Sequence, residues 1–583
     1  MVQTYKGSGR GNNGLIEVTV TLKDDVIEKV SVDSVNESPG IADYAIEVTP
    51  ELIVENQSYS FDAVTGATVT ASGIKKATKN ALSKAEVDLD QYDKQLDLIP
   101  VEEEPKIENK FVDPAEINWD KEYDVVVIGA GIAGMAAAIE AKEKGSRVLV
   151  VEYAPSYLHS NSTLCGGYYY TGASSLHEEA GIEDSREEWK KYLQAVGAGF
   201  EDPDMVDAYI EHAPEDMEWL MDLGVKFTTE GIIQMGDEKN QAHITKPVGR
   251  SLVCEEQAGY GLTMPVNKYA EKIGVDFVYQ TTAQKLITNK EGHVAGVITN
   301  RGNVRARQGV VVASAGFTRN IEWLKDFKPE MANTASYGSV RQQGDGIRMG
   351  MDVGADVGTM WMAIADSLGT QTADTVSVGI WIYMWDDPYY YVNSNGERFM
   401  DEGMYYEHAA KEIARQDGGY CWTIWDQRTV DNNRQNISAP APSPGCEREI
   451  EDGYWKRADT IEELADLIDV PVKNLVKTHE RYNTMMREKG EDKDFGREIG
   501  LYDMPEGPYY AAKTVSTSPD TAGGLKINKK AQVQDLWGNP IPNLYAAGAT
   551  TAGWRGAIYP GCGHAITNAV VFGRIAGQEV AGL

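Results

Sequence analysis

Runs of apolar residues along the chain predict two kinds of folded part. Near the N-terminus, apolar and polar positions alternate over 15–22 and again over 26–32. Alternation with a period of two is typical of half-buried strands, so these runs are predicted to form a hairpin. A helix is predicted from about Ser72 to Leu82. Residues 1–85 are therefore expected to form a small α+β domain.

The rest of the chain shows a different pattern. Residues 125–128 form a continuous apolar run, followed by a glycine-rich turn, an alanine-rich helix and a second apolar run at 148–151. Such runs are typical of strands buried on both faces, and this order is that of a βαβ unit with a parallel sheet. Two later runs, at 310–312 and 543–547, also lead into glycine turns, and a helix over 565–581 closes the chain.

These patterns predict an α/β fold with an insertion. A Rossmann-like domain is expected at 119–350 and 509–583, interrupted at 351–508 by an α+β capping domain. Residues 86–118 are acidic and contain three prolines, a composition typical of an extended linker.

Aromatic residues crowd the expected capping domain. They could line a pocket for a flat apolar ligand or pack between strands, and the sequence leaves both alternatives open. The residues are Trp361, Trp381, Tyr383, Trp385, Tyr389, Tyr390 and Tyr391.

Composition excludes several classes of function. The chain has 583 residues and a formal net charge of −34, which argues against nucleic acid because no excess of cations can neutralise phosphates. Its five cysteines include no C-x-x-C pair, and its eight histidines show no zinc-ligand spacing. Disulfide frameworks, haem attachment and metal centres are therefore not expected, and redox chemistry would come from organic cofactors.

Targeting features are missing from the sequence as it stands. The N-terminus has no charged segment followed by an apolar run, so no signal peptide is predicted. No stretch approaches the ~20 apolar residues that span a bilayer, so no membrane span is predicted. A cytoplasmic protein is expected, or an exported one if N-terminal residues had been removed.

Gly129, Gly131 and Gly134 form the pattern G-x-G-x-x-G between the first buried strand and the alanine-rich helix. In that context the motif predicts dinucleotide binding. The first glycine permits the turn, the second admits a pyrophosphate and the third packs the helix on the strand. Glu152, at the end of the next strand, is expected to accept hydrogen bonds from ribose hydroxyls. The motif does not distinguish FAD from NAD.

From about residue 119 to its end, the chain resembles the flavoprotein family of fumarate reductases, urocanate reductases and 3-ketosteroid dehydrogenases. The matching segments are 129–134, 165–167, 314–317, 344–346, 393–399 with Glu402, 523–524 and the turn at Gly548. The resemblance implies FAD as cofactor and a substrate covered by the capping domain. The residues that it implies in FAD binding are Gly129, Gly131, Gly134, Glu152, Gly166, Gly167, Ala283, Gly316, Asp345, Gly523 and Gly548.

The chain departs from the fumarate reductases where they hold their substrate with cations. Tyr406 stands in place of their arginine proton donor, and Tyr559 in place of a carboxylate-binding arginine. A dicarboxylate would lose the charge-assisted hydrogen bonds that its desolvation requires, so fumarate is not expected as substrate.

Both tyrosines match the 3-ketosteroid dehydrogenase group instead. This resemblance implies that the Tyr559 hydroxyl and the Gly563 N–H bind a ketone oxygen, and that Tyr406 exchanges a proton with the α-carbon. The chemistry agrees, because hydride addition to an enone requires stabilisation of the developing enolate oxygen. A tyrosine hydroxyl is protonated at neutral pH and can donate.

Residues 62–68, with the sequence Asp-Ala-Val-Thr-Gly-Ala-Thr, resemble the flavinylation segment of FMN-binding domains. The resemblance implies that a separate flavin transferase joins FMN covalently to Thr68. A covalent carrier of single electrons suits a reductase. It would be supplied by an electron donor, either a reductase protein or a reduced nicotinamide or flavin.

Together these observations predict an ene-reductase. Hydride would pass from FAD to the carbon–carbon double bond of an apolar enone, such as a 3-oxo-Δ4-steroid, with FMN as the relay. A second hypothesis is a reductase of an aryl-substituted unsaturated acid, of the cinnamate or urocanate kind, with Arg555 as the carboxylate anchor. A steroid dehydrogenase working oxidatively and a non-catalytic electron-transfer subunit are further alternatives.

Overall fold

The computed structural model describes residues 2–11, 14–35, 37, 42–61, 68–85, 87–94, 114–256, 258–331, 336, 338–339, 341–364, 367–371, 378–381, 388–431, 447–451 and 453–582. The chain divides into two compact units. The first comprises Met1–Pro105, Asn333–Tyr337 and Ala365–Thr517, and the second comprises Lys106–Ala332, Gly338–Ile364 and Ser518–Leu583.

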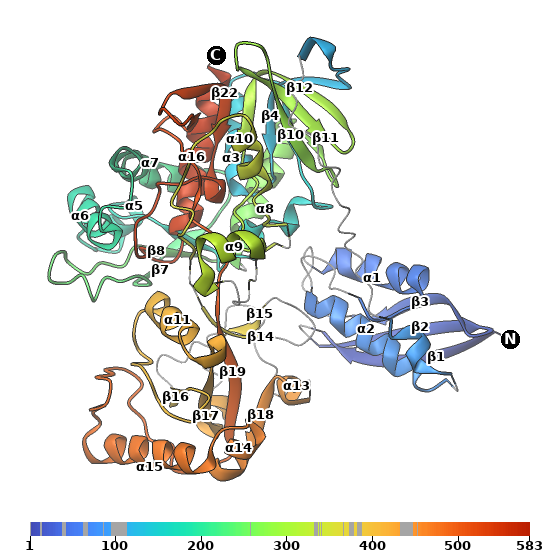
Figure 1. Cartoon of the computed structure of the whole chain (residues 1–583), viewed down its shortest axis with the longest axis vertical. Coiled ribbons are helices and arrows are strands. Elements are labelled where there is room, and N and C mark those ends of the chain that lie inside the picture. Colours follow the sequence, from blue (N-terminus) through green and yellow to red (C-terminus); the bar gives the residue numbers. More distant parts are fainter. Residues whose placement is uncertain are drawn as a thin grey trace. The chain divides into compact units, whose positions relative to one another are not determined.

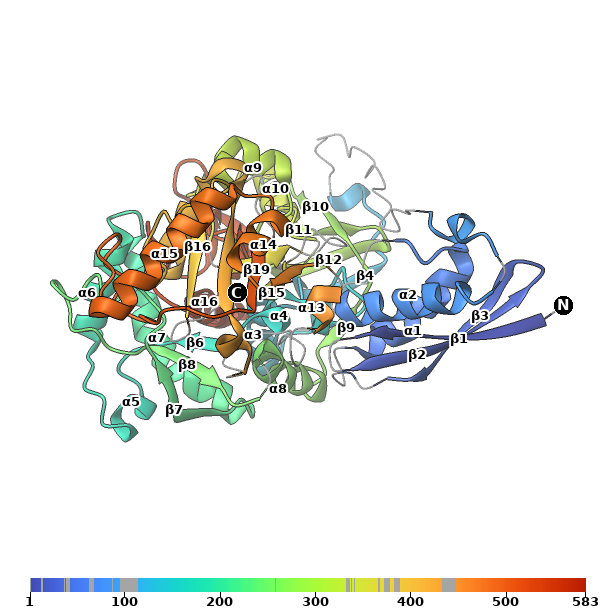
Figure 2. The same ribbon diagram turned by 90° about the horizontal axis from the view of Figure 1, so that it is seen from below.

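The first unit begins with a small domain in which two helices cover one face of an antiparallel sheet (Figures 1 and 2). In spatial order the strands are β1 (Val2–Arg10), β2 (Leu15–Lys23) and β3 (Val26–Ser34). The helices are α1 (Asp43–Asn56) and α2 (Thr68–Leu82). Along β2 exposed and buried positions alternate, as its sequence pattern predicts. The predicted hairpin and helix are thereby confirmed.

The apolar pattern does not predict β1, whose glycines lower its strand propensity. A Cβ on Gly7 would lie 2.0 Å from the carbonyl oxygen of Ala77, and one on Gly9 would lie 2.2 Å from that of Gly73. The two glycines thus allow α2 to pack directly on the β1 backbone. This contact is tertiary, so local propensity cannot indicate it.

Residues 87–94 fold onto this domain and do not begin an extended linker. They contain a short 3-10 helix, η1 (Leu89–Tyr92). Tyr92 is buried, its hydroxyl donates to the Asp25 carbonyl at 2.8 Å, and its carbonyl accepts the Tyr59 N–H at 3.0 Å. This buried side chain extends the domain past residue 85. Most of the expected linker, residues 95–113, lies outside the described residues.

The first unit also contains the capping domain, an antiparallel sheet in the order β15-β14-β19-β17-β16 with β18 paired to β19 (Figure 1). Its strands are β14 (Ser367–Gln371), β15 (Val378–Trp381), β16 (Tyr389–Val392), β17 (Tyr420–Asp426), β18 (Trp455–Ala458) and β19 (Tyr509–Thr517). Its helices are α11 (Tyr406–Ala414), α12 (Gln427–Asp431), α13 (Glu447–Glu451), α14 (Ile461–Leu467) and α15 (Val472–Lys489). Tyr389, Tyr390 and Tyr391 are buried in its core, so these three aromatic residues pack between strands and helices. Tyr383 and Trp385 lie outside the described residues.

Two boundaries of the capping domain lie later in the chain than the expected 351 and 508. β13 (Val357–Gly358) still pairs with β20 (Gly524–Leu525) in the second unit. β19 pairs with β14 and β17 through its last residues, and so belongs to the capping sheet. Backbone pairing sets these limits, and composition does not reveal it.

The second unit is built on an eight-stranded sheet in the order β10-β11-β12-β4-β5-β9, with β22 paired to β12 and β21 to β22. Its strands are β4 (Lys121–Ile128), β5 (Val148–Val151), β9 (Asp276–Val278), β10 (Ala283–Thr288), β11 (Val294–Thr299), β12 (Gly302–Val312), β21 (Gln532–Gln534) and β22 (Pro540–Ala546). β4, β5, β9, β12 and β22 are parallel. This is the predicted Rossmann-like domain.

Two helices lie side by side on this sheet, α3 (Ile132–Glu143) and α16 (His564–Ala581) (Figure 1). A Cβ on Gly573 would lie 2.5 Å from the carbonyl oxygen of Ala133, and one on Gly577 would lie 2.3 Å from that of Ala137. The small residues on both helices therefore bring the two backbones into direct contact.

The remaining elements of the second unit surround this core. They are α4 (Asn161–Leu164), β6 (Tyr168–Tyr170), α5 (Ser175–Glu179), α6 (Arg186–Gly197), α7 (Pro203–Asp222), β7 (Phe227–Ile233), β8 (Ser251–Cys254), α8 (Ala258–Lys272), α9 (Ile321–Phe327) and α10 (Asp345–Asp352). β6, β8 and β7 form a separate antiparallel sheet. Among the described residues, no helix has the length and apolar character needed to cross a membrane.

Candidate active site

The turns predicted to bind the cofactor leave the sheet along one edge. β5, β4, β12 and β22 run parallel and end in register. The ladder continues past their ends: Gly129 N–H donates to Val151 at 2.9 Å, and Ala547 N–H donates to Val312 at 3.0 Å. Ligands of open parallel sheets bind beyond the carboxyl ends of the strands. The structure therefore brings the turns after all four strands to the place where a dinucleotide would bind.

The three glycines of the dinucleotide motif differ in their surroundings. Gly129 has a φ of 105°, and a Cβ on it would lie 2.3 Å from the Ala313 carbonyl oxygen. A Cβ on Gly134 would lie 2.0 Å from the Gly129 carbonyl oxygen, so this glycine packs the helix on the strand. A Cβ on Gly131 would lie 3.5 Å from the Ser162 hydroxyl, which is an ordinary contact distance. Gly131 stands at the N-terminus of α3, where backbone N–H groups favour a pyrophosphate.

Glu152 lies beside this turn. Its carboxylate accepts the Ala130 N–H at 2.6 Å and the Ala154 N–H at 2.7 Å. Burial raises the pKa of Glu152, and these N–H groups oppose the rise. The Tyr153 N–H also bonds to this carboxylate. A carboxylate has about four lone-pair sites, so about one remains for a ribose hydroxyl. Ala283 is also close by along the chain, because Thr281 donates its N–H to the Glu152 carbonyl at 2.9 Å. Together with the N-terminus of α3 at Gly131, this arrangement fits FAD.

Gly166 and Gly167 follow α4, next to the dinucleotide turn. The Ser162 hydroxyl of α4 accepts the N–H of Ile132, the first residue of α3, at 3.1 Å. Gly167 has a φ of 77°, and its carbonyl accepts the Cys254 N–H at 3.0 Å. These contacts hold residues 160–167 against the N-terminus of α3.

The turn containing Gly316 lies after β12, next to the start of α10, whose first residue is Asp345. The Gly316 carbonyl accepts the Gly344 N–H at 3.0 Å, which places the start of α10 against this turn. A Cβ on Gly316 would lie 2.1 Å from the Thr521 hydroxyl. Gly523, two residues after Thr521, lies against the Met360 backbone, because a Cβ on Gly523 would lie 2.4 Å from the Met360 Cα. Gly548 contacts α3, because a Cβ on it would lie 3.0 Å from the Cβ of Ala133.

Asp520 is a buried carboxylate among these turns that the sequence interpretation missed. It accepts the Thr521 N–H at 2.9 Å. Burial raises its pKa to about 7, opposed by the N–H of Thr521, the side chain of Gln342 and the N–H of Gly316. Asp520 lies just before Gly523-Gly524, a segment that the family resemblance implies in FAD binding. This position in the sequence is the signal from which it could have been predicted.

Tyr559 and Gly563 lie together at the start of α16. The Tyr559 hydroxyl accepts the Ala565 N–H at 2.9 Å. Gly563 caps the helix with a φ of 98°, and a Cβ on it would lie 2.7 Å from the Tyr169 carbonyl carbon. The N-terminus of a helix carries a partial positive charge that favours a developing oxyanion. We call residues 559–563 the donor turn.

Arg555 and His564 border the donor turn. Arg555 is 2% exposed, its Nε donates to the Gly556 carbonyl at 3.1 Å, and its guanidinium lies 5.4 Å from the centre of the Tyr559 ring. His564 donates from Nε2 to the Trp554 carbonyl at 3.0 Å. Burial lowers the pKa of His564 to about 3, so this ring is neutral. Arg555 is therefore a buried cation beside the predicted donor.

Tyr406 belongs to the first unit, where it begins α11. It is 3% exposed, and its ring centre lies 4.3 Å from that of Tyr405. The segment before it is held by Arg398, which donates to Glu402 at 2.6 Å and to Asp492 at 2.8 Å, all within the capping domain. The arginine and glutamate of the recognised 393–402 segment thus form a buried ion pair that fixes the backbone leading to Tyr406.

Thr68 is the first residue of α2, a helix of 15 residues. Its side chain and residues 62–67 lie outside the described residues. A phosphate esterified at residue 68 would lie at a helix N-terminus, where backbone N–H groups favour an anion.

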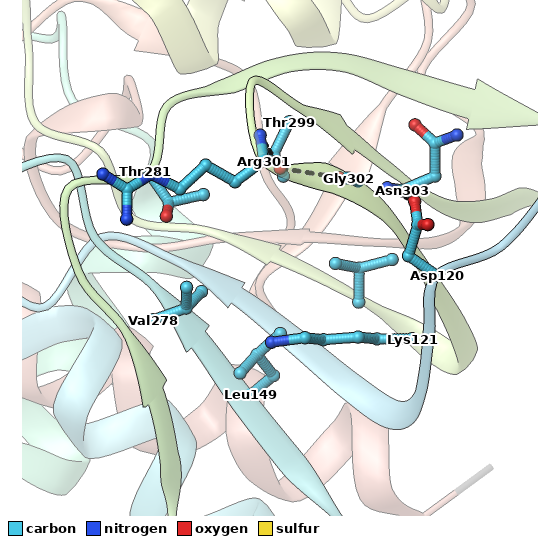
Figure 3. Close-up of a pocket in the computed structure, with 10 residues that line it drawn as sticks. Asp120, Lys121, Leu149, Val278, Thr281, Thr299, Arg301, Gly302 and Asn303 are labelled. Atoms are coloured by element: carbon cyan, nitrogen blue, oxygen red, sulfur yellow. Dashed lines mark hydrogen bonds between the residues drawn. The ribbon is translucent and has the colours of Figure 1, made fainter.

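A pocket elsewhere in the second unit does not coincide with these residues (Figure 3). It lies largely around the start of β4 and the turn between β11 and β12, whereas Gly129 follows the other end of β4. In this pocket the Thr299 hydroxyl donates to the Gly302 carbonyl at 2.6 Å. Figure 3 marks this hydrogen bond with a dashed line. The lining residues are Asp120, Lys121, Leu149, Val278, Thr281, Thr299, Arg301, Gly302, Asn303 and Val304.

Comparison with known proteins gives matches over nearly the whole chain. The FAD binding domain family matches residues 124–566, and the FMN-binding domain family matches residues 11–83. The urocanate reductase of Eggerthella lenta is 29% identical over 100% of this chain and 92% of its own length. The digoxin reductase of the same organism is 30% identical over 81% of this chain and 89% of its own.

A solved structure is also similar. It is 3-ketosteroid-Δ4-(5α)-dehydrogenase from Rhodococcus jostii RHA1 in complex with 4-androstene-3,17-dione. Its sequence is 26% identical, the TM-score is 0.64, and the match covers 81% of this chain and 99% of that one.

Proposed function

Because this chain belongs to the FAD binding domain family, carries an FMN-binding domain and is a flavin-dependent oxidoreductase acting on carbon–carbon double bonds, we propose that it reduces an apolar α,β-unsaturated ketone. A 3-oxo-Δ4-steroid is an example of the substrate that we propose. The observation that carries the proposal is the donor turn, where the Tyr559 hydroxyl and Gly563 meet the first turn of α16.

Two neutral donors suit a ketone oxygen. A hydroxyl that accepts one hydrogen bond still has a proton to donate, and the Ala565 N–H fixes the direction of the Tyr559 oxygen. FAD, when bound, supplies the hydride that adds to the β-carbon. Negative charge then develops on the substrate oxygen, where the Tyr559 O–H, the Gly563 N–H and the N-terminus of α16 stabilise it. Tyr406 donates a proton to the α-carbon, which completes the reduction.

The N-terminal domain fits the reductive direction. FMN joined to Thr68 by a flavin transferase would carry single electrons from a donor, either a reductase protein or a reduced nicotinamide or flavin. The urocanate and digoxin relatives are themselves reductases by name, and the first of them matches this chain from end to end. Both facts support reduction over steroid oxidation.

A second candidate is a reductase of an aryl-substituted unsaturated acid. The observation in its favour is Arg555, a buried cation whose guanidinium lies 5.4 Å from the Tyr559 ring centre. A buried arginine can hold a carboxylate by two parallel hydrogen bonds. The urocanate reductase of Eggerthella lenta supports this alternative.

The substrate class can be tested directly. The holoenzyme is reduced under anaerobic conditions and mixed with a panel of cyclic enones, steroidal enones, cinnamate and urocanate, and reoxidation of the flavins is followed. The proposal expects rapid reoxidation by enones and slow reoxidation by the acids. If only acids reoxidise the enzyme, the ketone assignment is wrong and the Arg555 alternative replaces it.

A further inference from the structure

Tyr192 lies on α6, far from the donor turn in sequence, yet it is bonded directly to that turn. The side chain is fully buried, and its hydroxyl donates to the Pro560 carbonyl at 2.5 Å. The same hydroxyl oxygen accepts the Asp237 N–H at 2.9 Å. Pro560 follows Tyr559 immediately, so one side chain joins two loops at the residue next to the predicted donor.

The loop at 235–237 makes two further contacts with the donor turn. Gly236 and Gly561 form an antiparallel bridge, and Cys562 donates its N–H to the Met235 carbonyl at 3.1 Å. A Cβ on Gly236 would lie 2.0 Å from the Pro560 carbonyl oxygen, so only glycine permits this approach. The donor turn is therefore held from the side of α6 by backbone pairing and by the Tyr192 hydroxyl.

Tyr192 itself is held by a buried ion pair. The Arg250 guanidinium lies 5.5 Å from the Tyr192 ring centre and donates to the two carboxylate oxygens of Asp184 at 2.7 and 2.8 Å. Both side chains of this pair are completely buried. Glu238 accepts the Gly236 N–H at 2.9 Å and so fixes the loop from its other side.

We propose that Tyr192 is a positioning residue for catalysis, which orients the Tyr559 hydroxyl and the Gly563 N–H toward the substrate oxygen by holding the Pro560 carbonyl. The inference rests on the proposed function of the donor turn. An oxyanion site works only when its donors are preorganised, and a small displacement of a positioned group is costly. Removing the Tyr192 hydroxyl removes its hydrogen bond to the middle of the turn but leaves the Tyr559 side chain chemically unchanged.

The test is Tyr192→Phe in the holoenzyme, with Tyr509→Phe as the matched control. Tyr509 is also buried and also donates to a backbone carbonyl, that of Met504 at 3.3 Å, but it lies in the capping domain. We expect kcat per bound FAD to fall about tenfold in Tyr192→Phe and to change less than twofold in the control. The KM for the substrate should change little, because the hydroxyl does not contact it.

A second measurement separates positioning from structural loss. Planar phenols resemble the enolate, so their affinity for the oxidised enzyme reports on the oxyanion donors. Tyr192→Phe should bind such a phenol about tenfold more weakly, with FAD content and the melting temperature equal to those of the control variant. If FAD content or the melting temperature falls while kcat per bound FAD is unchanged, Tyr192 is structural and the proposal is overturned.

A further variant covers the case in which Tyr192→Phe does not fold. Gly236→Ala would place a methyl group 2.0 Å from the Pro560 carbonyl oxygen and 2.8 Å from the Tyr192 hydroxyl. It should lower kcat in the same way while residue 192 remains a tyrosine. Unchanged kcat and phenol affinity in Gly236→Ala would also overturn the proposal. The kinetics of these variants can be measured with any compound of the substrate panel that the wild type reduces. A wrong ketone assignment would therefore be detected by the panel, and a wrong Tyr192 proposal by the variants.

Discussion

The backbone N–H of Ala565 donates to the hydroxyl oxygen of Tyr559 at 2.9 Å. This bond ties the side chain at the start of the donor turn to the helix at its end. It fixes the phenol without using its proton. The predicted ketone donor is thus positioned by the backbone, and its own contribution can be measured by removing the hydroxyl alone.

Replacement of Tyr559 by Phe should lower kcat/KM for an enone by about a hundredfold, because one of the two donors to the developing oxyanion is lost. FAD content, measured from the absorbance of released flavin, should not change. Tyr269→Phe is the control, since its hydroxyl donates at the surface of the same unit to Glu143 at 2.7 Å. Equal rates in the two variants would remove Tyr559 from the catalytic role.

Replacement of Tyr406 by Phe should slow turnover by about a hundredfold, because the α-carbon loses its proton donor. Tyr405, whose ring packs against that of Tyr406, provides the matched control as Tyr405→Phe. In deuterated solvent the product of the wild type should carry deuterium at the α-carbon. Loss of turnover in the Tyr405 variant alone would assign the proton to the neighbour.

Replacement of Thr68 by Ala should abolish covalent FMN while FAD is retained, because the hydroxyl that forms the phosphate ester is removed. Mass spectrometry of the denatured protein, produced together with a flavin transferase, gives the measurement. Thr65→Ser is the control, because it keeps a hydroxyl residue at this position of the flavinylation segment 62–68. The peptide containing Thr68 should then retain the mass of FMN. Release of all flavin from the wild type on acid precipitation would contradict the assignment.

Glu238 should make stability depend on pH. Burial raises its pKa from 4.5 to about 7. The folded protein therefore holds this proton more tightly than the unfolded chain, so its contribution to stability is lost as pH rises through that interval. Glu238→Gln is neutral throughout and should decline less in melting temperature between about pH 5 and pH 8.

The exposed residue Glu230 provides the control for this experiment as Glu230→Gln. Its melting temperatures should follow those of the wild type at every pH. If the melting temperature of Glu238→Gln falls with pH as steeply as that of the wild type, Glu238 does not carry a proton in the folded state.

Sequence alone predicts the parts of this fold that are determined locally. The run at 125–128, the glycine turn and the alanine-rich helix appear where expected, because burial on both faces and a tight turn leave a local pattern. β1 escaped prediction because it depends on pairing with β2 and on contact between its glycines and α2. Tyr192 escaped for the same reason, since its partner Pro560 lies 368 residues away.

The residues of the candidate site remain predictions of two kinds. The glycines and Glu152 follow from the spacing of one motif, and the donor turn follows from family resemblance. Asp520 is part of the candidate site only because the folded chain brings it together with Gly316 and Gln342, which bond to its carboxylate. Burial of a carboxylate among loops leaves no pattern in the sequence.

The close contact of α3 with α16 also limits how substrate choice can vary in this enzyme. α3 begins at the glycine turn of the dinucleotide motif and α16 begins at the donor turn, and the two helix backbones are in direct contact at Gly573 and Gly577. Inserting one residue between Gly563 and Gly573 would shift the donor turn by about 1.5 Å and rotate it by about 100°. Under the proposed function, this packing would set the distance between the cofactor and the ketone oxygen. New substrates would have to be accommodated by changing the walls of the site.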